Sequence, residues 1–282
     1  MRWEASLARI AARVPELRTR WQESKPFRYL VCDAFLMPDF AEQILSEYPS
    51  PSSAVWNDTT YVHQRRKLTL TSGFPALIAE FFDLTSSDEF REVLTEITGI
   101  DALLHDPDLV GGGLHQVLPG GFLNVHVDYN FHPKTKLHRR LNLLLYMNEQ
   151  WKEEYGGYLE LWDMSERRQI ESIAPTFNRA VLFETNEVSF HGHPRPIASP
   201  PAITRKSLAV YYYSVHRNVA EVAPEHNTLY RQTTGLAGLL KVLRSSLEAT
   251  RERLRTAGPA KLGRAMVARM TRLLSGAPPP NN

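Results

Sequence analysis

The feature that most constrains the fold is a series of short β-prone segments between Gly111 and Ser214, separated by turn residues and not by helices. These segments are Gly113–Leu118, Phe122–Asp128, Arg139–Met147, Gly157–Trp162, Arg168–Ile173, Arg179–Glu184 and Lys206–Ser214. Connections are predicted at Pro119-Gly120-Gly121, Gly156-Gly157 and Ala174-Pro175. Many short strands without intervening helices are typical of an all-β sandwich or jelly roll. We therefore predict a mainly β fold.

Helical patterns flank this β region. Apolar residues at helical spacing predict an amphipathic helix over Glu4–Gln22, and further helices are predicted over Pro38–Tyr48 and Ser86–Thr98. The stretch Phe27–Phe35 is β-prone and opens the main domain. The expected organisation is an N-terminal helix in residues 1–26, a β domain with supporting helices in 27–217, and a basic helical extension with a disordered end in 218–282.

Composition narrows the chemistry. The chain has 282 residues, 43% of them hydrophobic and 23% charged, which is ordinary for a globular protein. Its single cysteine, Cys32, excludes an internal disulfide and thiolate metal sites, so any metal must be held by His, Asp or Glu. Charges are scattered through the N-terminus, so it lacks the uninterrupted apolar stretch of a signal peptide. No other segment is long and apolar enough to cross a bilayer. A cytoplasmic location is expected.

Charge is distributed unevenly along the chain. Nine Lys/Arg and two acids in Gly235–Asn282 give this tail a charge of +7, so the remainder carries −5 of the net +2. The tail predicts two amphipathic helices, Leu239–Arg255 and Lys261–Leu274. Packing on the domain or on a partner subunit is the ordinary interpretation; docking on an anionic membrane surface is the alternative. Without interleaved aromatic residues, nucleic acid is not an expected partner.

The chemistry is concentrated in FLNVHVD at Phe122–Asp128. Residues two apart on a strand project to one face, so Asn124, His126 and Asp128 point together. An imidazole and a carboxylate at this spacing can bind one metal ion, and His191 on a later segment can add a third ligand. Two His and one carboxylate on one face, with the other positions open, are typical of non-haem iron(II) oxygenases. A lone His-x-Asp is common by chance, so the interpretation depends on the whole set.

Arg205 lies fourteen residues after His191, the candidate third ligand. Arg205 begins the last β-prone segment, with Ser207 on the same face. A guanidinium there can bind a carboxylate in bidentate fashion, and Ser207 can add a hydrogen bond. The ordinary alternative for Arg205 is a surface charge at a loop exit.

Four stretches together resemble a known family: PGGFLNVHVDYN, RRLNLLLYMNEQWKEEYGGYLELWD, SFHGHPRPI and RKSLAVYYYS. They are similar to the prolyl-4-hydroxylase-like branch of the 2-oxoglutarate/iron(II) oxygenases. The resemblance implies a double-stranded β-helix, or jelly roll, with iron(II), 2-oxoglutarate and O2 as cofactors. It implies that 2-oxoglutarate is decarboxylated to succinate while a substrate C–H bond is oxidised. By position, the metal ligands fall on His126, Asp128 and His191, and the 2-oxoglutarate arginine on Arg205.

Two choices within the family are open to sequence reasoning. His193 lies two residues beyond His191, but Gly192 and Pro194 suggest that the strand ends near His191, and the family motif favours His191 as the ligand. Halogenating relatives lack the carboxylate that Asp128 supplies here, so hydroxylation or a related oxidation is expected and halogenation is disfavoured.

Further candidates for contacts to the co-substrate are Asn142, Tyr146, Gln116 and Asn124. Alternation in RRLNLLLYM puts Arg140, Asn142 and Tyr146 on one face and the leucines Leu141, Leu143 and Leu145 on the other, without deciding which face is interior. The family places a polar residue near the co-substrate, which favours Tyr146. Many relatives carry a tyrosine at or near Gln116, so Gln116 and Asn124 are the substitutes expected near the 2-oxoglutarate C1 carboxylate.

The substrate is less well defined. The basic loop HPKTKLHRR suggests an anionic small-molecule substrate, although a solvated hairpin loop explains it equally well. We expect hydroxylation of a small molecule or biosynthetic intermediate, such as an amino acid, a sugar or a natural-product precursor. The alternatives are a protein (prolyl-type) hydroxylase and, from another class, a non-catalytic metal-binding jelly-roll sensor. The oligomeric state is open.

Overall fold

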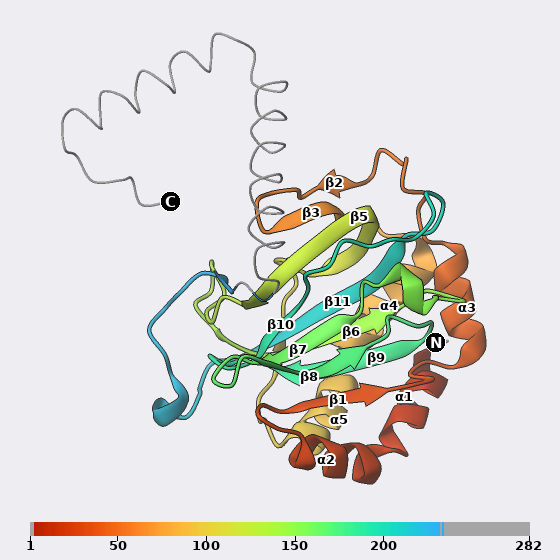
Figure 1. Ribbon diagram of the computed structural model, residues 1–282. Helices are drawn as coiled ribbons and strands as arrows, with labels where there is room; N and C mark the ends of the chain where they lie inside the picture. The colour runs from red at the N-terminus through yellow and green to blue at the C-terminus, as the bar shows by residue number, and fades with distance from the viewer. Residues whose placement is uncertain (1–2, 232, 234–282) are drawn as a thin grey trace, which may run out of the picture.

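The computed structural model describes residues 3–231 and residue 233 (Figure 1). The predicted helices Leu239–Arg255 and Lys261–Leu274, the disordered end, and with them the expected membrane contact, lie outside the described residues. Residues 218–231, which the sequence assigned to the helical extension, contain a short 3-10 turn at Val219–Glu221 and a strand at Leu229–Tyr230. No helix within the described ranges has an apolar stretch of the length needed to cross a membrane.

The described residues form a strongly curled antiparallel sheet with helices gathered on one side (Figure 1). The strands are β1 Tyr29–Cys32, β2 Asn57–Asp58, β3 Gln64–Leu70, β4 Leu104–His105, β5 Gly113–Val127, β6 His138–Tyr146, β7 Leu159–Asp163, β8 Arg168–Ile173, β9 Arg179–Glu184, β10 Phe190–His193, β11 Arg205–Ser214 and β12 Leu229–Tyr230. The helices are α1 Trp3–Ala11, α2 Val14–Glu23, α3 Pro38–Ser46, α4 Ala76–Ser86 and α5 Asp88–Thr98, with a 3-10 turn at Glu153–Tyr155. The mainly β, jelly-roll prediction is confirmed.

Strand β5 joins the two halves of the curl. The main path of the sheet runs β1-β9-β6-β11-β5-β10-β7-β8. The first half of β5 pairs with β11, while its second half pairs with β10. Both halves also pair with β3. A side chain on the inner face of β5 therefore lies between the two halves of the curl.

The predicted connection at Pro119-Gly120-Gly121 is wrong, because β5 continues through it. Gly120 has φ of +80°, and a Cβ on Gly121 would lie 2.4 Å from Cγ1 of Val117 and 2.8 Å from the carbonyl oxygen of Arg65. The two glycines thus allow the strand to bend sharply against β3 without breaking. The residues Pro119-Gly120-Gly121 therefore lie at a bend within β5 and not at its end.

The helices confirm most of the predicted elements and correct one. The single helix predicted over Glu4–Gln22 is two helices, α1 and α2, because Pro15 lacks the N–H needed to continue the first one and its ring would clash with the preceding turn. Helix α5 begins at the cap Ser87, whose hydroxyl accepts from the backbone N–H of Phe90, and ends at Gly99 with φ of +72°. Helix α4 and strand β3 were not predicted.

The main core lies between the helices and the outer face of the sheet. Leu141, Leu143 and Leu145 of β6 are buried there, together with residues of α4 and α5. Because strand residues alternate, Asn142, Leu144 and Tyr146 face the interior of the curl. The structure thus decides the choice that alternation left open: the polar face of β6 is the inner one.

Candidate metal centre and co-substrate cavity

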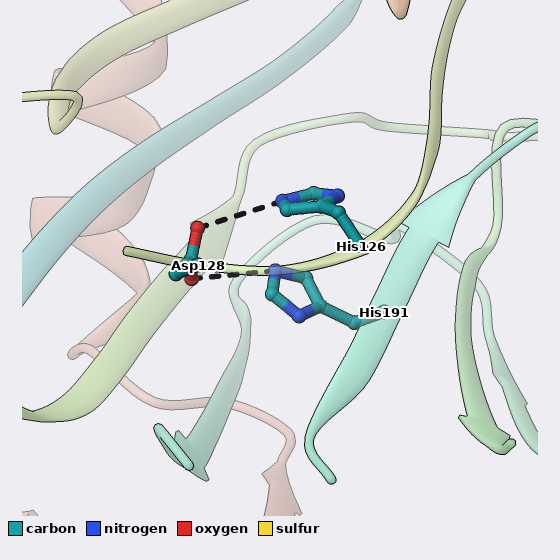
Figure 2. A group of neighbouring side chains, drawn as sticks. All are labelled: His126, Asp128 and His191. Carbon is teal, nitrogen blue, oxygen red and sulfur yellow. Dashed lines mark ion pairs between the residues drawn. The ribbon is translucent and has the colours of Figure 1, made fainter. Parts of the chain in front are cut away.

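Three side chains converge at the end of β5 (Figure 2). His126 lies on β5 directly opposite His191 on β10, and Asp128 follows the last residue of β5. Nε2 of His126 is 3.5 Å from Oδ1 of Asp128, and Nε2 of His191 is 3.6 Å from Oδ2. One ligand atom from each of the three residues lies within 4.8 Å of the others, close enough to share one metal ion.

The two imidazoles are oriented for metal binding. Nδ1 of His126 donates to the carbonyl oxygen of Asn124 at 2.8 Å, and Nδ1 of His191 donates to that of Ser189 at 2.9 Å. These bonds place the proton on Nδ1 and leave the Nε2 lone pair facing Asp128, the arrangement that metal-binding histidines adopt. Burial and the neighbouring His126 lower the pKa of His191 to about 4, so its ring is neutral. The donor set therefore fits iron(II).

Asp128 is held by two residues of β6. Nδ2 of Asn142 donates to Oδ2 of Asp128 at 2.7 Å, and Nη2 of Arg139 lies 3.1 Å from the same oxygen. Burial alone would raise the pKa of this carboxyl, but Arg139, His191 and His126 hold it well below its usual range. Since Oδ2 already has two donors, Oδ1 is the oxygen with fewer competing contacts and is better placed for a metal ion.

Arg139 is the residue of this centre that sequence reasoning missed. Tyr212 pairs with Leu141 but Tyr213 pairs with Arg139, so Arg140 is the extra residue of a bulge. Arg140 consequently turns outward to Ser214 Oγ, which corrects its predicted place beside Asn142. Arg139 turns inward, is only 1% exposed, and stacks 3.7 Å above the Tyr211 ring. Alternation in the sequence does not reveal a bulge, so it does not predict that Arg139 faces inward.

The rest of the basic loop does not form a free anionic-substrate surface. Nζ of Lys134 is 2.6 Å from Asp108, and Nζ of Lys136 is 2.6 Å from Glu225. Both pairs are exposed, and their partners lie on neighbouring loops. The solvated-loop interpretation suits these two lysines better.

Arg205 is buried at the start of β11, 5% exposed. Its Nε donates to the carbonyl oxygen of Gly157 at 2.7 Å, and its Nη2 donates to the hydroxyl of Tyr146 at 3.1 Å. These two bonds fix the guanidinium plane, and Nη1 has no hydrogen bond to the described residues. Ser207, two residues on, lies on the same face and directly opposite both Tyr146 and His115.

The three metal-site residues, Arg139, Arg205 and Ser207 line one cavity of about 360 Å³. His115 and Val117 line it as well, so Gln116 between them points to the other face of β5. Asn124 is also absent from the lining; its amide contacts Nδ1 of His63 at 3.1 Å. Neither Gln116 nor Asn124 therefore lies where a co-substrate contact was predicted. The structure groups His191, not His193, with the other two ligands.

A second wall of the cavity comes from segments that carried no prediction of a site. Tyr230 of β12 lies directly opposite His126 and stacks on the His63 ring, with centroids 4.1 Å apart. Its hydroxyl bonds to that of Tyr61. Both tyrosines line the cavity, as does Lys67 of β3.

Comparison with known proteins agrees with this geometry. Residues 112–213 match the family model described as the 2OG-Fe(II) oxygenase superfamily. A segment of 57 residues, 19% of this chain, is 39% identical to prolyl 3-hydroxylase OGFOD1 of Mus musculus and 37% identical to that of Xenopus laevis. The match spans only about a tenth of the length of these curated relatives.

Two solved structures share the fold. The Pseudomonas putida prolyl-4-hydroxylase superposes with a TM-score of 0.53 at 18% identity, over 71% of this chain and 100% of that one. The Trichoplax adhaerens prolyl hydroxylase, solved with a peptide fragment of the hypoxia-inducible factor oxygen degradation domain, superposes with a TM-score of 0.54 at 15% identity, over 74% and 92%. The matched segment 112–213 contains His126, Asp128, His191 and Arg205, so the part of the chain that carries this site is similar to the 2OG-Fe(II) oxygenase superfamily.

Proposed function

We propose that this chain is a 2-oxoglutarate-dependent hydroxylase that binds iron(II) through His126, Asp128 and His191 and binds 2-oxoglutarate through Arg205. The observation that supports this most directly is that the three-ligand group and the buried guanidinium line the same cavity. The overall reaction consumes the substrate, O2 and 2-oxoglutarate, and yields the hydroxylated substrate, succinate and CO2. A non-catalytic metal-binding sensor would have no need of Arg205 to anchor a co-substrate.

Each residue has a definite task. Nε2 of His126, Nε2 of His191 and Oδ1 of Asp128 would hold the metal. Iron(II), when bound there, would supply the oxidising chemistry. Nη1 of Arg205 would donate to the distal carboxylate of 2-oxoglutarate, with the Ser207 hydroxyl beside it. Tyr146 does not line the cavity, and its hydroxyl would hold the guanidinium in place. Because Asp128 supplies the carboxylate ligand, we expect hydroxylation and not halogenation.

For the substrate we favour a small molecule, such as an amino acid, a sugar or a natural-product precursor. The cavity of about 360 Å³ has to hold 2-oxoglutarate as well as the reacting part of the substrate. Tyr61 and Tyr230 add to its wall beside His126. The space near the metal therefore suits a compact group.

A prolyl residue in a protein is the second candidate. The 57-residue match to prolyl 3-hydroxylase OGFOD1 favours it. A pyrrolidine ring is itself compact, so it suits the same cavity provided that the peptide backbone stays outside.

Succinate release tests both the reaction and the substrate class. The full chain, loaded with iron(II), is incubated with 2-oxoglutarate and O2, and succinate is measured with free amino acids and sugars in one arm and proline-containing peptides in the other. Substrate-dependent succinate that disappears in His126→Ala supports the proposal. An iron-bound wild-type protein that neither binds nor decarboxylates 2-oxoglutarate contradicts it.

A further inference from the structure

Lys67 points into the cavity because β3 contains a bulge. Gln64 also lines the cavity, so regular alternation from Gln64 would turn Arg66 inward and Lys67 outward. The register between β3 and β5 instead shifts between Arg65 and Lys67, and Arg66 has φ of +54° and is exposed. Arg66 is thus the extra residue, and Lys67 takes the inward position.

Lys67 and Arg205 occupy the same row of the sheet. Arg205 on β11 and Lys67 on β3 both lie directly opposite Val117 of β5, one on each side. Directly opposed residues of antiparallel strands project to the same face, and all three side chains line the cavity. Two strand spacings separate the Cα atoms of Arg205 and Lys67, roughly 10 Å. Both side chains are long enough to reach one ligand lying over Val117.

The two cations differ in their protein partners. Arg205 donates to Gly157 and Tyr146, whereas the ammonium of Lys67 has no hydrogen bond or ion pair within residues 3–231 and 233. Burial lowers the pKa of Lys67 to about 8, helped by repulsion from Arg205 and offset in part by Asp128. A partly buried ammonium without an acceptor is costly, so its retention in a cavity wall indicates that a ligand supplies the acceptor.

The charges around the cavity indicate what that ligand is. Among the described lining residues, Lys67, Arg139 and Arg205 are basic and Asp128 is acidic. Arg139 is already paired with Asp128, and burial holds the pKa of His115 well below its usual range, with Lys67 adding to the effect. Two cations, Arg205 and Lys67, therefore remain for a ligand. 2-Oxoglutarate carries two carboxylates.

We propose that Lys67 is a second binding residue for 2-oxoglutarate, donating a charge-assisted hydrogen bond to a carboxylate oxygen from the side of Val117 opposite Arg205. This inference rests on the proposed function, because it assumes that 2-oxoglutarate occupies the cavity. It adds a contact from β3, a strand outside the matched segment 112–213.

The test is a binding titration that does not need the primary substrate. The full chain, loaded with iron(II) under anaerobic conditions, is titrated with 2-oxoglutarate, and the visible metal-to-ligand charge-transfer band gives Kd. Wild type is compared with Lys67→Met, Lys67→Arg and the neighbouring control Arg66→Met. Iron(II) affinity and the thermal midpoint of each variant are measured in parallel, to detect damage to the metal site or the fold.

We expect Lys67→Met to raise Kd for 2-oxoglutarate by about ten- to a hundred-fold, the usual effect of losing a charge-assisted hydrogen bond. Lys67→Arg should recover most of the affinity, and Arg66→Met should bind as wild type does. A Kd within two-fold of wild type in a folded, iron-binding Lys67→Met protein overturns the role of Lys67 and leaves the proposed function intact. Absence of the band in wild type overturns both proposals.

Discussion

The cavity has two walls that are built differently. The first wall, from β5, β10 and β11, carries the proposed metal ligands and Arg205. Strand pairing places His191 opposite His126 and Arg205 opposite Val117, and Asp128 directly follows β5. The second wall, from β3, β12 and the loop before β3, carries Lys67, Tyr61 and Tyr230. Its placement depends on a bulge and on pairing with the far end of the described chain. The first-wall residues lie within the segment that matches the family model, whereas Lys67, Tyr61 and Tyr230 lie outside it.

Loss of a metal ligand should have the largest effect, because it breaks the first wall at its centre. We expect His126→Ala to lower turnover by more than about a hundred-fold. Mutation of a residue that only hydrogen-bonds to a metal ligand typically lowers metal affinity or activity by about ten- to a hundred-fold, and loss of the ligand itself should cost more. Iron(II) binding and succinate formation are the measurements. His193→Ala is the matched control, because His193 lines the cavity without joining the three-ligand group. Equal losses in both variants would contradict the assignment of His191 as the third ligand.

Arg205→Met should come next. Removing the buried guanidinium is expected to raise Kd for 2-oxoglutarate by about a hundred-fold while iron(II) affinity changes little. The charge-transfer titration measures the first and metal titration the second. Arg195→Met, an exposed arginine near Glu160, is the control of equal charge. If Arg205→Met bound 2-oxoglutarate normally, the co-substrate would have to lie elsewhere in the cavity.

Arg139→Met tests whether a residue placed by a bulge supports the first wall. We expect a roughly ten-fold weaker affinity for iron(II), typical of losing a neighbour that orients a ligand. Because Arg139 helps to hold the pKa of Asp128 low, its loss should raise that pKa. On acidification, Asp128 of the variant then takes up its proton at a higher pH than Asp128 of wild type. The variant should therefore release iron at a higher pH. Metal titrations across pH check this, and an unchanged profile would assign Arg139 a packing role only.

Tyr230→Phe should have the smallest effect and sharpen the comparison. It removes the hydroxyl bond to Tyr61 but keeps the ring stacked on His63. We expect unchanged affinity for iron(II) and 2-oxoglutarate, and a change of a few-fold in the apparent KM of the primary substrate, consistent with one hydrogen bond of about 1 kcal/mol. Steady-state kinetics with a substrate found in the succinate assay would measure it. A large loss of iron binding would show that the second wall supports the metal centre after all.

The same difference explains what the sequence could and could not predict. His126 and Asp128 are two apart at the end of β5, where the extended backbone puts them on one side. His191 and Arg205 follow in the order that the family resemblance implies. Arg139 and Lys67 face inward only because Arg140 and Arg66 are extra residues in bulges, and alternation assigns those positions wrongly. Tyr230 meets His126 through pairing between distant segments, which no local pattern encodes.

Gln116 shows a further limit. It occupies the position at which the resemblance placed a co-substrate contact, yet the bend at Gly120-Gly121 leaves His115 and Val117 as the inward residues. A motif carries residue identities reliably, but which side of a strand they face depends on every bend in that strand.

The pairing of β12 with β5 also bears on how the protein is handled. The backbone beside His126 meets Leu229 and Tyr230, and the N–H of Arg231 donates to Val125. A fragment that stopped before Leu229 would present an unpaired strand edge at the end of β5 that carries His126, the kind of edge that recruits other chains into aggregates. A shortened version of this protein should therefore retain Arg231, and poor solubility of a shorter one would say nothing about its chemistry.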